Sequence, residues 1–463
     1  SFTALKDDEL NSIIAYLHIH KLKGKKLDKP DPLAIKDPIP EKIDSSDVQA
    51  GIQLVAQIPK SFNEKPFARI EKLDVMPGTN RIFILDLRGK LYSLINHTAV
   101  QYLDISSYKP KFIDKPGLAT GFGSFAFHPD YMKNGLFYTT HSEPPNSSKA
   151  DFNYEDSINV TLQWVVCEWK AQHPGKVPFS GTCREILRVN MVSGIHGVQE
   201  IAFNPLAKKN SSDYGKLYIG VGDGGSVENG YPFIAHHINR IWGTIIRIDP
   251  SGTNSKNGKY GVPTDNPFVN NTTPGAIKEI FAYGFRNPNT MTWTKDGRML
   301  VTNIGQANIE SVNVILKGND YGWPIREGSF ALDTLSDLTK VHALPANDSI
   351  YHITYPVVQF DHDEGSAISG GKVYYGSGIP QLKGNYLFGD IVSGRLFFAN
   401  VNEMYIGHKA EIKEWHIVNE SGIINLRKLC GSNRVDLHFG QDHKGDVYIF
   451  TKADGKLYKL IRK

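Results

Sequence analysis

Charged and amide side chains are concentrated in one stretch of the chain, YGFRNPNTMTWTKDGRMLVTNIGQANIESVNVILKGNDYGWP. Arg286 and Asn287 precede a strand–turn–strand pattern within it, and Glu310, Asn313 and the turn NDYGWP follow that pattern. A rigid sheet can present side chains at the ends of its strands to a ligand. The stretch therefore predicts a ligand-binding site beside the ends of short β-strands.

A histidine flanked by glycines, His196, lies in the segment SGIHGVQEIAFNP, directly before a predicted strand at 200–203. An imidazole with a pKa near neutrality can act as a general base. Asp223, in GVGDGGS, could orient this imidazole or line the pocket, and a simple turn before Gly-Gly is the alternative. Residue type alone does not decide the matter, because a given histidine among sixteen is more often structural or on the surface.

Signatures of other enzyme classes are missing from the sequence. It has no GxSxG, no HExxH and no GxGxxG that opens a helix after a strand, which weighs against hydrolases, zinc proteases and nicotinamide enzymes. The GDGG at 222–225 is not followed by acidic residues at EF-hand spacing.

The three cysteines form no CxxC motif, so the sequence contains neither a zinc ribbon nor a haem-attachment site. Cys167 and Cys183 flank a predicted hairpin. They could form a disulfide in an oxidising compartment, and two buried thiols are the alternative.

Composition excludes two further classes. The net charge is only +4, from 52 basic and 48 acidic residues, and no block of like charge is present, so nucleic-acid binding has little support. No run of 18 apolar residues occurs, which predicts no membrane-spanning helix. The segments rich in Trp, Tyr and Gly favour an exported protein, periplasmic or extracellular.

A strand–turn–strand pattern with turns of Pro, Asp, Gly and Asn recurs along the chain with a period of about 68 residues. Its six copies lie at 73–95, 125–143, 201–225, 291–305, 370–400 and 437–461. Repeats of short strands that cannot bury both faces alone are typical of a β-propeller. The sequence predicts an all-β fold, a six-bladed β-propeller over residues 51–463.

The first 50 residues have a different pattern. Residues 1–19 predict an amphipathic helix, and residues 20–50, rich in Lys, Asp and Pro, predict an extended linker. The helix resembles the closing helix of a class I cytochrome c, which implies a haem domain upstream of Ser1 as the electron acceptor. A generic helix that packs on the main domain is the alternative.

The motifs RNP, GQ followed by Glu310 and Asn313, and NDYGWP resemble the soluble quinoprotein glucose/sorbosone dehydrogenase family. That family oxidises sugars with pyrroloquinoline quinone and Ca²⁺. The resemblance implies that His196 is the general base, which takes the proton of a sugar C1 hydroxyl while hydride leaves for the cofactor.

The same resemblance places Arg286 and Asn287 against the cofactor, because a planar guanidinium suits its carboxylates and quinone oxygens. An ion pair between blades is the alternative role of Arg286. The family has Gln where this chain has the shorter Asn289, which puts one cofactor contact in doubt. Gly305 and Gln306 align with the backbone carbonyls that hold the cofactor's calcium ion.

The C-terminal part departs from the glucose-oxidising members. They carry a Lys in the fifth blade and two Arg in the sixth that pair with the quinone, whereas this chain reads GDIVSGRLFFAN and GSNRVDLHFG. Arg395 and Arg434 stand near those places but out of register. Arg434 is the better candidate for a cofactor contact.

The leading hypothesis is a quinoprotein that oxidises an aldose at C1 to the lactone and passes electrons to cytochrome c or another acceptor. The wider group also includes hedgehog-interacting-protein-like propellers without known turnover, and fold alone does not establish catalysis. A non-catalytic propeller that binds a glycan or protein partner is therefore the alternative. A lactonase-type hydrolytic propeller is a third possibility, and it requires acidic and Asn side chains around a channel metal.

Overall fold

The computed structural model describes residues 31–334 and 337–463. The helix predicted at 1–19 and its cytochrome-like character lie outside the described residues. Strand β1 (Asp44–Gln57) spans the predicted boundary at residue 50 between linker and propeller. None of the helices in the described ranges is both long enough and apolar enough to cross a membrane.

The described part of the chain is nearly all β, and consecutive segments pair into antiparallel sheets. Four sheets have four strands each. These strands are β2 (Ile70–Val75), β3 (Ile82–Asp86), β4 (Lys90–Ile95) and β5 (Thr98–Asp104); β6 (Phe122–Phe127), β7 (Leu136–Glu143), β8 (Leu162–Ala171) and β9 (Gly181–Met191); β10 (Glu200–Phe203), β11 (Leu217–Val221), β12 (Thr244–Ile248) and β13 (Ile280–Tyr283); and β14 (Pro288–Trp293), β15 (Met299–Asn303), β16 (Ile309–Ile315) and β20 (Val358–Asp361).

A longer sheet joins two later groups of strands through β1, which pairs in parallel with β24 and antiparallel with β28. Its other strands are β21 (Ile368–Val373), β22 (Asn385–Asp390), β23 (Leu396–Asn400), β24 (Lys413–Asn419), β25 (Gly422–Ile423), β26 (Leu437–Gln441), β27 (Val447–Thr451) and β28 (Lys456–Ile461). The first strand of the described chain therefore closes the fold against its last.

The remaining elements are short. A small sheet lies between β16 and β20 in the sequence and contains β17 (Arg326–Glu327), β18 (Phe330–Leu332) and β19 (Val341–His342). The helices are α2 (Tyr131–Asn134), α3 (Leu426–Cys430) and the 3₁₀ turns η1 (Ile105–Ser107), η2 (Pro232–Ile234), η3 (Asp348–Tyr351), η4 (Pro380–Leu382) and η5 (Val401–Glu403).

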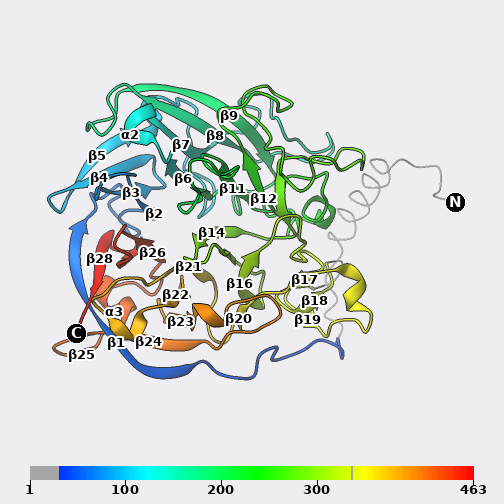
Figure 1. Cartoon of the computed structure of the whole chain (residues 1–463). Helices are drawn as coiled ribbons and strands as arrows, with labels where there is room; N and C mark the ends of the chain where they lie inside the picture. Colours follow the sequence, from blue (N-terminus) through cyan, green and yellow to red (C-terminus); the bar gives the residue numbers. More distant parts are fainter. Residues whose placement is uncertain (1–30, 335–336) are drawn as a thin grey trace.

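The sheets are arranged around a common axis, and the first strand of each lies nearest to it (Figure 1). Around the ring, β2 lies beside β6, β6 beside β10, β10 beside β14, β14 beside β21, β21 beside β26, and β26 beside β2 again. This closed arrangement is consistent with the predicted β-propeller. It brings the loops that precede the first strands to one end of the axis.

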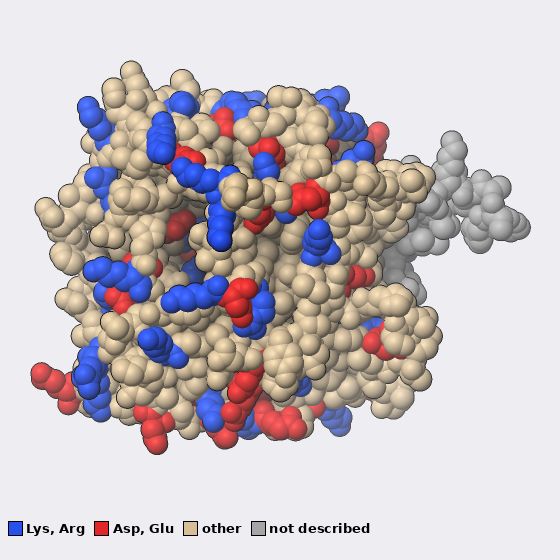
Figure 2. All heavy atoms as spheres, viewed as in Figure 1, with Lys and Arg blue, Asp and Glu red and all other residues tan. Residues whose placement is uncertain are grey.

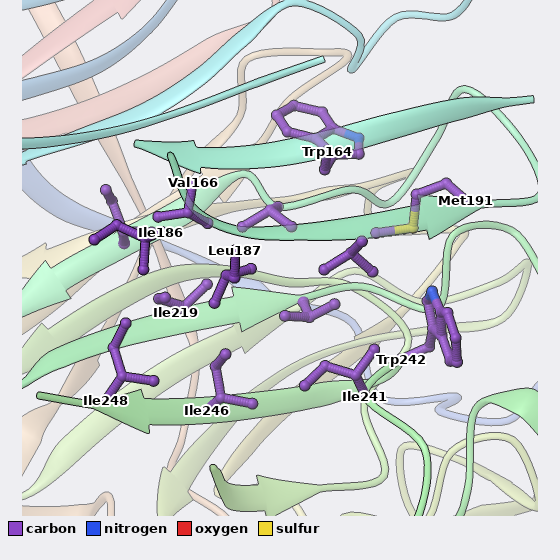
Figure 3. Packing of buried hydrophobic residues seen from close by; sticks show 14 of the residues in the cluster. Trp164, Val166, Ile186, Leu187, Met191, Ile219, Ile241, Trp242, Ile246 and Ile248 are labelled. Atoms are coloured by element: carbon purple, nitrogen blue, oxygen red, sulfur yellow. The ribbon is translucent and has the colours of Figure 1, made fainter. Parts of the chain in front are cut away.

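Apolar side chains fill the space between neighbouring sheets. Figure 3 shows Val166 and Leu187, from β8 and β9, facing Ile219 and Ile246 from β11 and β12. Successive residues of a strand point to opposite faces, so each strand contributes alternate side chains to such a layer. Full burial of a side chain of this size contributes roughly 1.5–3 kcal/mol. These layers hold the sheets at fixed positions around the axis.

The thiols of Cys167 and Cys183 are free in the structure. Cys167 is completely buried, and burial raises the pKa of its thiol to about 12. The structure therefore shows the second of the two alternatives for Cys167, a buried thiol, whereas Cys183 is only partly covered.

Closure through β1 can be tested at the strand that pairs with it. Leu460 on β28 is buried opposite Ile52 of β1, whereas Leu54 of β1 is half-exposed. We expect Leu460→Ala to lower the free energy of unfolding by about 2–5 kcal/mol. Leu54→Ala should change it by only about 0.5 kcal/mol. Denaturant unfolding measures both, and equal effects would contradict this account of the closure.

Candidate active site

Three loops from neighbouring sheets bring His196, Asp223 and Arg286 together. His196 lies shortly before β10, Asp223 follows β11, and Arg286 precedes β14. The backbone N–H of Asp223 donates to the carbonyl of Arg286 (2.8 Å), and the N–H of Gly224 donates to the carbonyl of His196 (3.1 Å). These backbone bonds fix the three side chains relative to one another.

His196 and Asp223 form a buried hydrogen-bonded pair, with 2.8 Å between Nδ1 and Oδ1. Asp223 is inaccessible to solvent, and its carboxylate also accepts from the indole Nε1–H of Trp323 (3.0 Å) and the N–H of Gly225 (2.8 Å). Three donors favour the ionised form of a carboxyl group. Asp223 thus lies where its carboxylate can hold the imidazole of His196 in one orientation.

The hydrogen bond also determines the tautomer of His196. An ionised carboxylate can only accept, so Nδ1 carries the proton and Nε2 presents a lone pair. Within the described residues, Nε2 makes no hydrogen bond. Burial, followed by the charge of Arg286, lowers the pKa of His196, although Asp223 raises it in part. At neutral pH the ring is therefore uncharged and can accept a proton at Nε2.

The backbone around His196 is strained in a way that glycine neighbours make possible. His196 has φ +49°, a left-handed conformation that is uncommon for residues other than glycine. A Cβ on Gly197 would lie 2.0 Å from Nε1 of Trp164, and one on Gly222 would lie 2.3 Å from the carbonyl oxygen of His196. Both glycines are therefore required for the imidazole to take this position.

Arg286 is buried, and its guanidinium has several partners. Its Nε donates to Oε1 of Gln306 (3.0 Å), one terminal nitrogen donates to the carbonyl of Ile304 (3.3 Å), and the other forms an ion pair with Glu228. The guanidinium carbon lies 5.8 Å from the ring centre of Trp323. Glu228 lies in the loop between β11 and β12, in the sheet that precedes β14. The ion pair between neighbouring sheets, which was the alternative role of Arg286, is therefore present.

The two asparagines near Arg286 are also buried. The N–H groups of Arg286 and Asn287 both donate to Oδ1 of Asn303, at 3.1 and 2.9 Å. Asn289 lies in β14, two residues further on. Arg286, Asn287 and Asn289 therefore all lie at the beginning of β14, the first strand of its sheet.

Gly305 and Gln306 are held by two carboxylates through their N–H groups. The N–H of Gly305 donates to both oxygens of Glu310 (3.2 Å each), and that of Gln306 donates to Oε1 of Glu327 (2.7 Å). Neither carbonyl accepts a hydrogen bond from another described residue. Two oxygens of the type that Ca²⁺ prefers therefore remain available at this loop.

The two arginines near the C-terminus have other partners. Arg395 forms ion pairs with Glu364 (2.6 Å) and Glu414 (2.7 Å), and Arg434 is half-exposed with its Nε 2.6 Å from Asp436. Within the described residues, Arg434 makes no contact with His196 or Arg286. The structure thus brings His196, Asp223 and Arg286 together and leaves Arg434 outside this group.

Sequence reasoning missed three acidic or imidazole groups at the site, Glu228, Glu327 and His362. Nε2 of His362 lies 2.9 Å from Oε1 of Glu310. Oε1 of Glu327 accepts from consecutive backbone N–H groups of the loop that begins at Gln306. Only His362 had a usable signal, because it lies in DHDEG just before a repeat copy.

Cavities lie beside this cluster and away from it. A small cavity of about 10 Å³ is lined by Arg286, Gly305, Trp323 and Glu327. A larger one of about 1420 Å³ lies between the β7–β8 loop and residues 239–279, and none of the predicted site residues lines it. Figure 2 shows the face of the molecule hollowed near its centre, with basic and acidic side chains around the hollow.

The fold is that of soluble sugar dehydrogenases of known structure. The apo-form of the soluble aldose sugar dehydrogenase from Escherichia coli superimposes with a TM-score of 0.59 at 18% identity, over 89% of this chain and 99% of that one. The form of the Streptomyces coelicolor aldose sugar dehydrogenase with bound PQQ gives 0.58 at 18% identity, over 89% and 98%.

The chain belongs to the Glucose / Sorbosone dehydrogenase family, whose model matches residues 69–459. The resemblance inferred from the motifs is thereby confirmed. Curated relatives include the HIPL2 protein of Arabidopsis thaliana, 27% identical over 83% of this chain and 60% of that protein. The human hedgehog-interacting protein is 25% identical over 83% and 49%, and the E. coli aldose sugar dehydrogenase YliI is 31% identical over 53% and 57%. The chain thus spans about half to three-fifths of these relatives.

Two substitutions near His196 should shift the pKa of its imidazole in opposite directions. Because Asp223 raises the pKa of His196 and Arg286 lowers it, Asp223→Asn should lower this pKa further and Arg286→Gln should raise it. In the parent protein the pKa should lie below 6.5. NMR titration with labelled histidine measures all three values. A parent pKa above 6.5, or shifts of the same sign in both variants, would contradict the described environment.

Proposed function

We propose that this chain is a quinoprotein aldose dehydrogenase that oxidises an aldose at C1 to the lactone. The observation that carries the proposal is the buried His196–Asp223 pair with Nε2 of His196 free, next to a buried arginine. Membership of the family supports it, as does the match to a solved aldose sugar dehydrogenase with bound PQQ. The ring of first strands then corresponds to six blades, and β1 is the outer strand of the last.

The residues present fit the reactive end of pyrroloquinoline quinone. The free carbonyls of Gly305 and Gln306 suit Ca²⁺, and the buried guanidinium of Arg286 suits quinone or carboxylate oxygens. Asn287 and Asn289 offer amides close by. Fewer basic side chains are available for the cofactor's carboxylates, since Arg395 and Arg434 pair with acids of this chain and Arg286 itself pairs with Glu228.

The protein's own part in the reaction follows from the hydrogen bonds. His196 takes the proton of the C1 hydroxyl at Nε2, and Asp223 keeps Nδ1 protonated and stabilises the imidazolium that forms. Arg286 holds an anionic oxygen in place without changing its own protonation state. Bound pyrroloquinoline quinone with Ca²⁺ supplies the hydride acceptor for the hydrogen at C1.

The proposal extends to location and partners. We infer a periplasmic or extracellular protein whose substrate is a small sugar and whose electron acceptor is cytochrome c or another redox protein. The aldose sugar dehydrogenases among its structural relatives support the sugar substrate.

Reconstitution tests the enzyme class. Purified protein without cofactor is mixed with pyrroloquinoline quinone and Ca²⁺, and dye reduction is followed with a panel of aldoses. We expect activity that requires both additions, with a quinone absorbance shifted by binding. Absence of activity together with an unperturbed quinone spectrum would reject the proposal.

Two substitutions separate catalysis from cofactor binding. His196→Ala should lower kcat by about 10²–10⁴-fold and leave quinone affinity nearly unchanged, because it removes only the base. Arg286→Ala should weaken quinone binding by about 10- to 100-fold, because it removes charged hydrogen bonds. His173→Ala, at an exposed turn, is the matched control. Parent-like behaviour of both site variants would show that the site is elsewhere.

A non-catalytic propeller that binds a glycan or protein partner is the second candidate. The internal pairing of Arg395 and Arg434 favours it, because charge that would neutralise a tri-anionic cofactor is already used. The similarity to the hedgehog-interacting protein points the same way. Tight quinone binding in the reconstitution experiment would exclude this candidate.

A further inference from the structure

A segment ahead of β1, residues 31–43, runs along the outside of the molecule before the chain joins the ring (Figure 1, dark blue). We call it the strap. Backbone N–H groups of the strap donate to the body: that of Ile35 to the carbonyl of Val341 (2.8 Å), and that of Ile39 to Oδ2 of Asp361 (3.0 Å). Ile43, at its end, packs against an apolar cluster of the body. The strap is therefore attached close to the end of β20, where Asp361 lies.

Three carboxylates meet at this attachment. Asp37 comes from the strap, Asp361 ends β20, and Asp363 lies two residues further on. One oxygen from each lies within 4.8 Å of the other two. Like charges at such a distance repel one another, so the arrangement requires a compensating positive charge.

Asp361 carries the second observation. The residue is only 3% exposed, and its Oδ1 is enclosed without a hydrogen-bond partner among the described residues, although Oδ2 accepts from the strap. Leaving a buried carboxylate oxygen unpaired costs free energy, more than for a neutral group. A buried, unpaired oxygen on a member of this carboxylate cluster is an atom that a bound cation would satisfy.

The nearby lysine does not complete the site. Lys42 pairs with Asp363, but both side chains are about half exposed, and exposed pairs of this kind contribute at most about 1 kcal/mol. One lysine thus leaves three clustered carboxylates with excess negative charge.

We propose that Asp37, Asp361 and Asp363 bind a calcium ion that fastens the strap to the end of β20. Hard cations take oxygen ligands, and Mg²⁺ is usually held by only one or two carboxylates, whereas Ca²⁺ takes six to eight oxygen ligands. Three carboxylates whose oxygens lie within 4.8 Å of one another therefore favour Ca²⁺. Water or backbone oxygens complete the coordination.

The site links two parts of the fold. The strap leads directly into β1, the strand that joins β24 to β28. On the other side, His362 lies between two of the ligands and contacts Glu310, whose carboxylate accepts from Gly305. A cation here stabilises ring closure and the loop next to the candidate active site. The site does not depend on the proposed dehydrogenase activity.

The test uses the full chain, stripped of metal with a chelator and free of quinone. Calcium is titrated by calorimetry, and the thermal midpoint is measured with and without Ca²⁺. We expect one binding event and a rise in Tm of several degrees. Asp37→Asn, which changes an exposed side chain, and Asp361→Asn should each weaken binding at least tenfold and abolish the rise. Asp47→Asn, at an exposed carboxylate of β1, should behave like the parent.

The outcomes also separate this site from the carbonyls proposed for the cofactor's calcium. Asp37→Asn should keep quinone-dependent dye reduction at saturating Ca²⁺ while it loses the Tm response. Calcium binding that is equal in the parent and in both site variants would overturn the proposal. So would the absence of any Tm response in the parent, or a response to Mg²⁺ but not to Ca²⁺.

Discussion

Closure of the ring by β1 is the constraint on which the positions of all other elements depend. With β1 between β24 and β28, the sheets form a closed circle and the first strand of each points to a common axis. Loops that precede first strands and loops that follow second strands must then meet at one end. His196, Asp223 and Arg286 are neighbours for this reason, although almost a hundred residues separate them in the sequence.

The cluster at that end is held by buried polar groups whose partners are already in place. Asp223 has three donors, and Arg286 has Glu228, Gln306 and a backbone carbonyl. The cost of burying these polar groups is met when the protein folds. A ligand that binds here therefore does not have to order them. The same pairing limits how much positive charge remains for an anionic ligand.

The all-β fold could be predicted because each repeat copy carries its own strands and turns. His196 was singled out mainly through the family resemblance, and the glycines beside His196 and Asp223 were a weaker signal. Glu228 and Glu327 were not singled out, because they lie in loops outside the repeat and act through contacts with distant residues. The out-of-register position noted for Arg434 has a structural counterpart, since its side chain turns to Asp436. The early start of β1 was hidden because its partner β24 is more than 350 residues away.

β1 is hydrogen-bonded along both edges, in parallel to β24 and antiparallel to β28, and this affects how the fold resists a pulling force. Tension on the chain ahead of β1 acts along the strand, so hydrogen bonds on both of its edges bear the load together in shear. Peeling them one at a time would require a force across the sheet. Whatever is attached ahead of β1 can therefore pull on this protein without opening its ring at the seam.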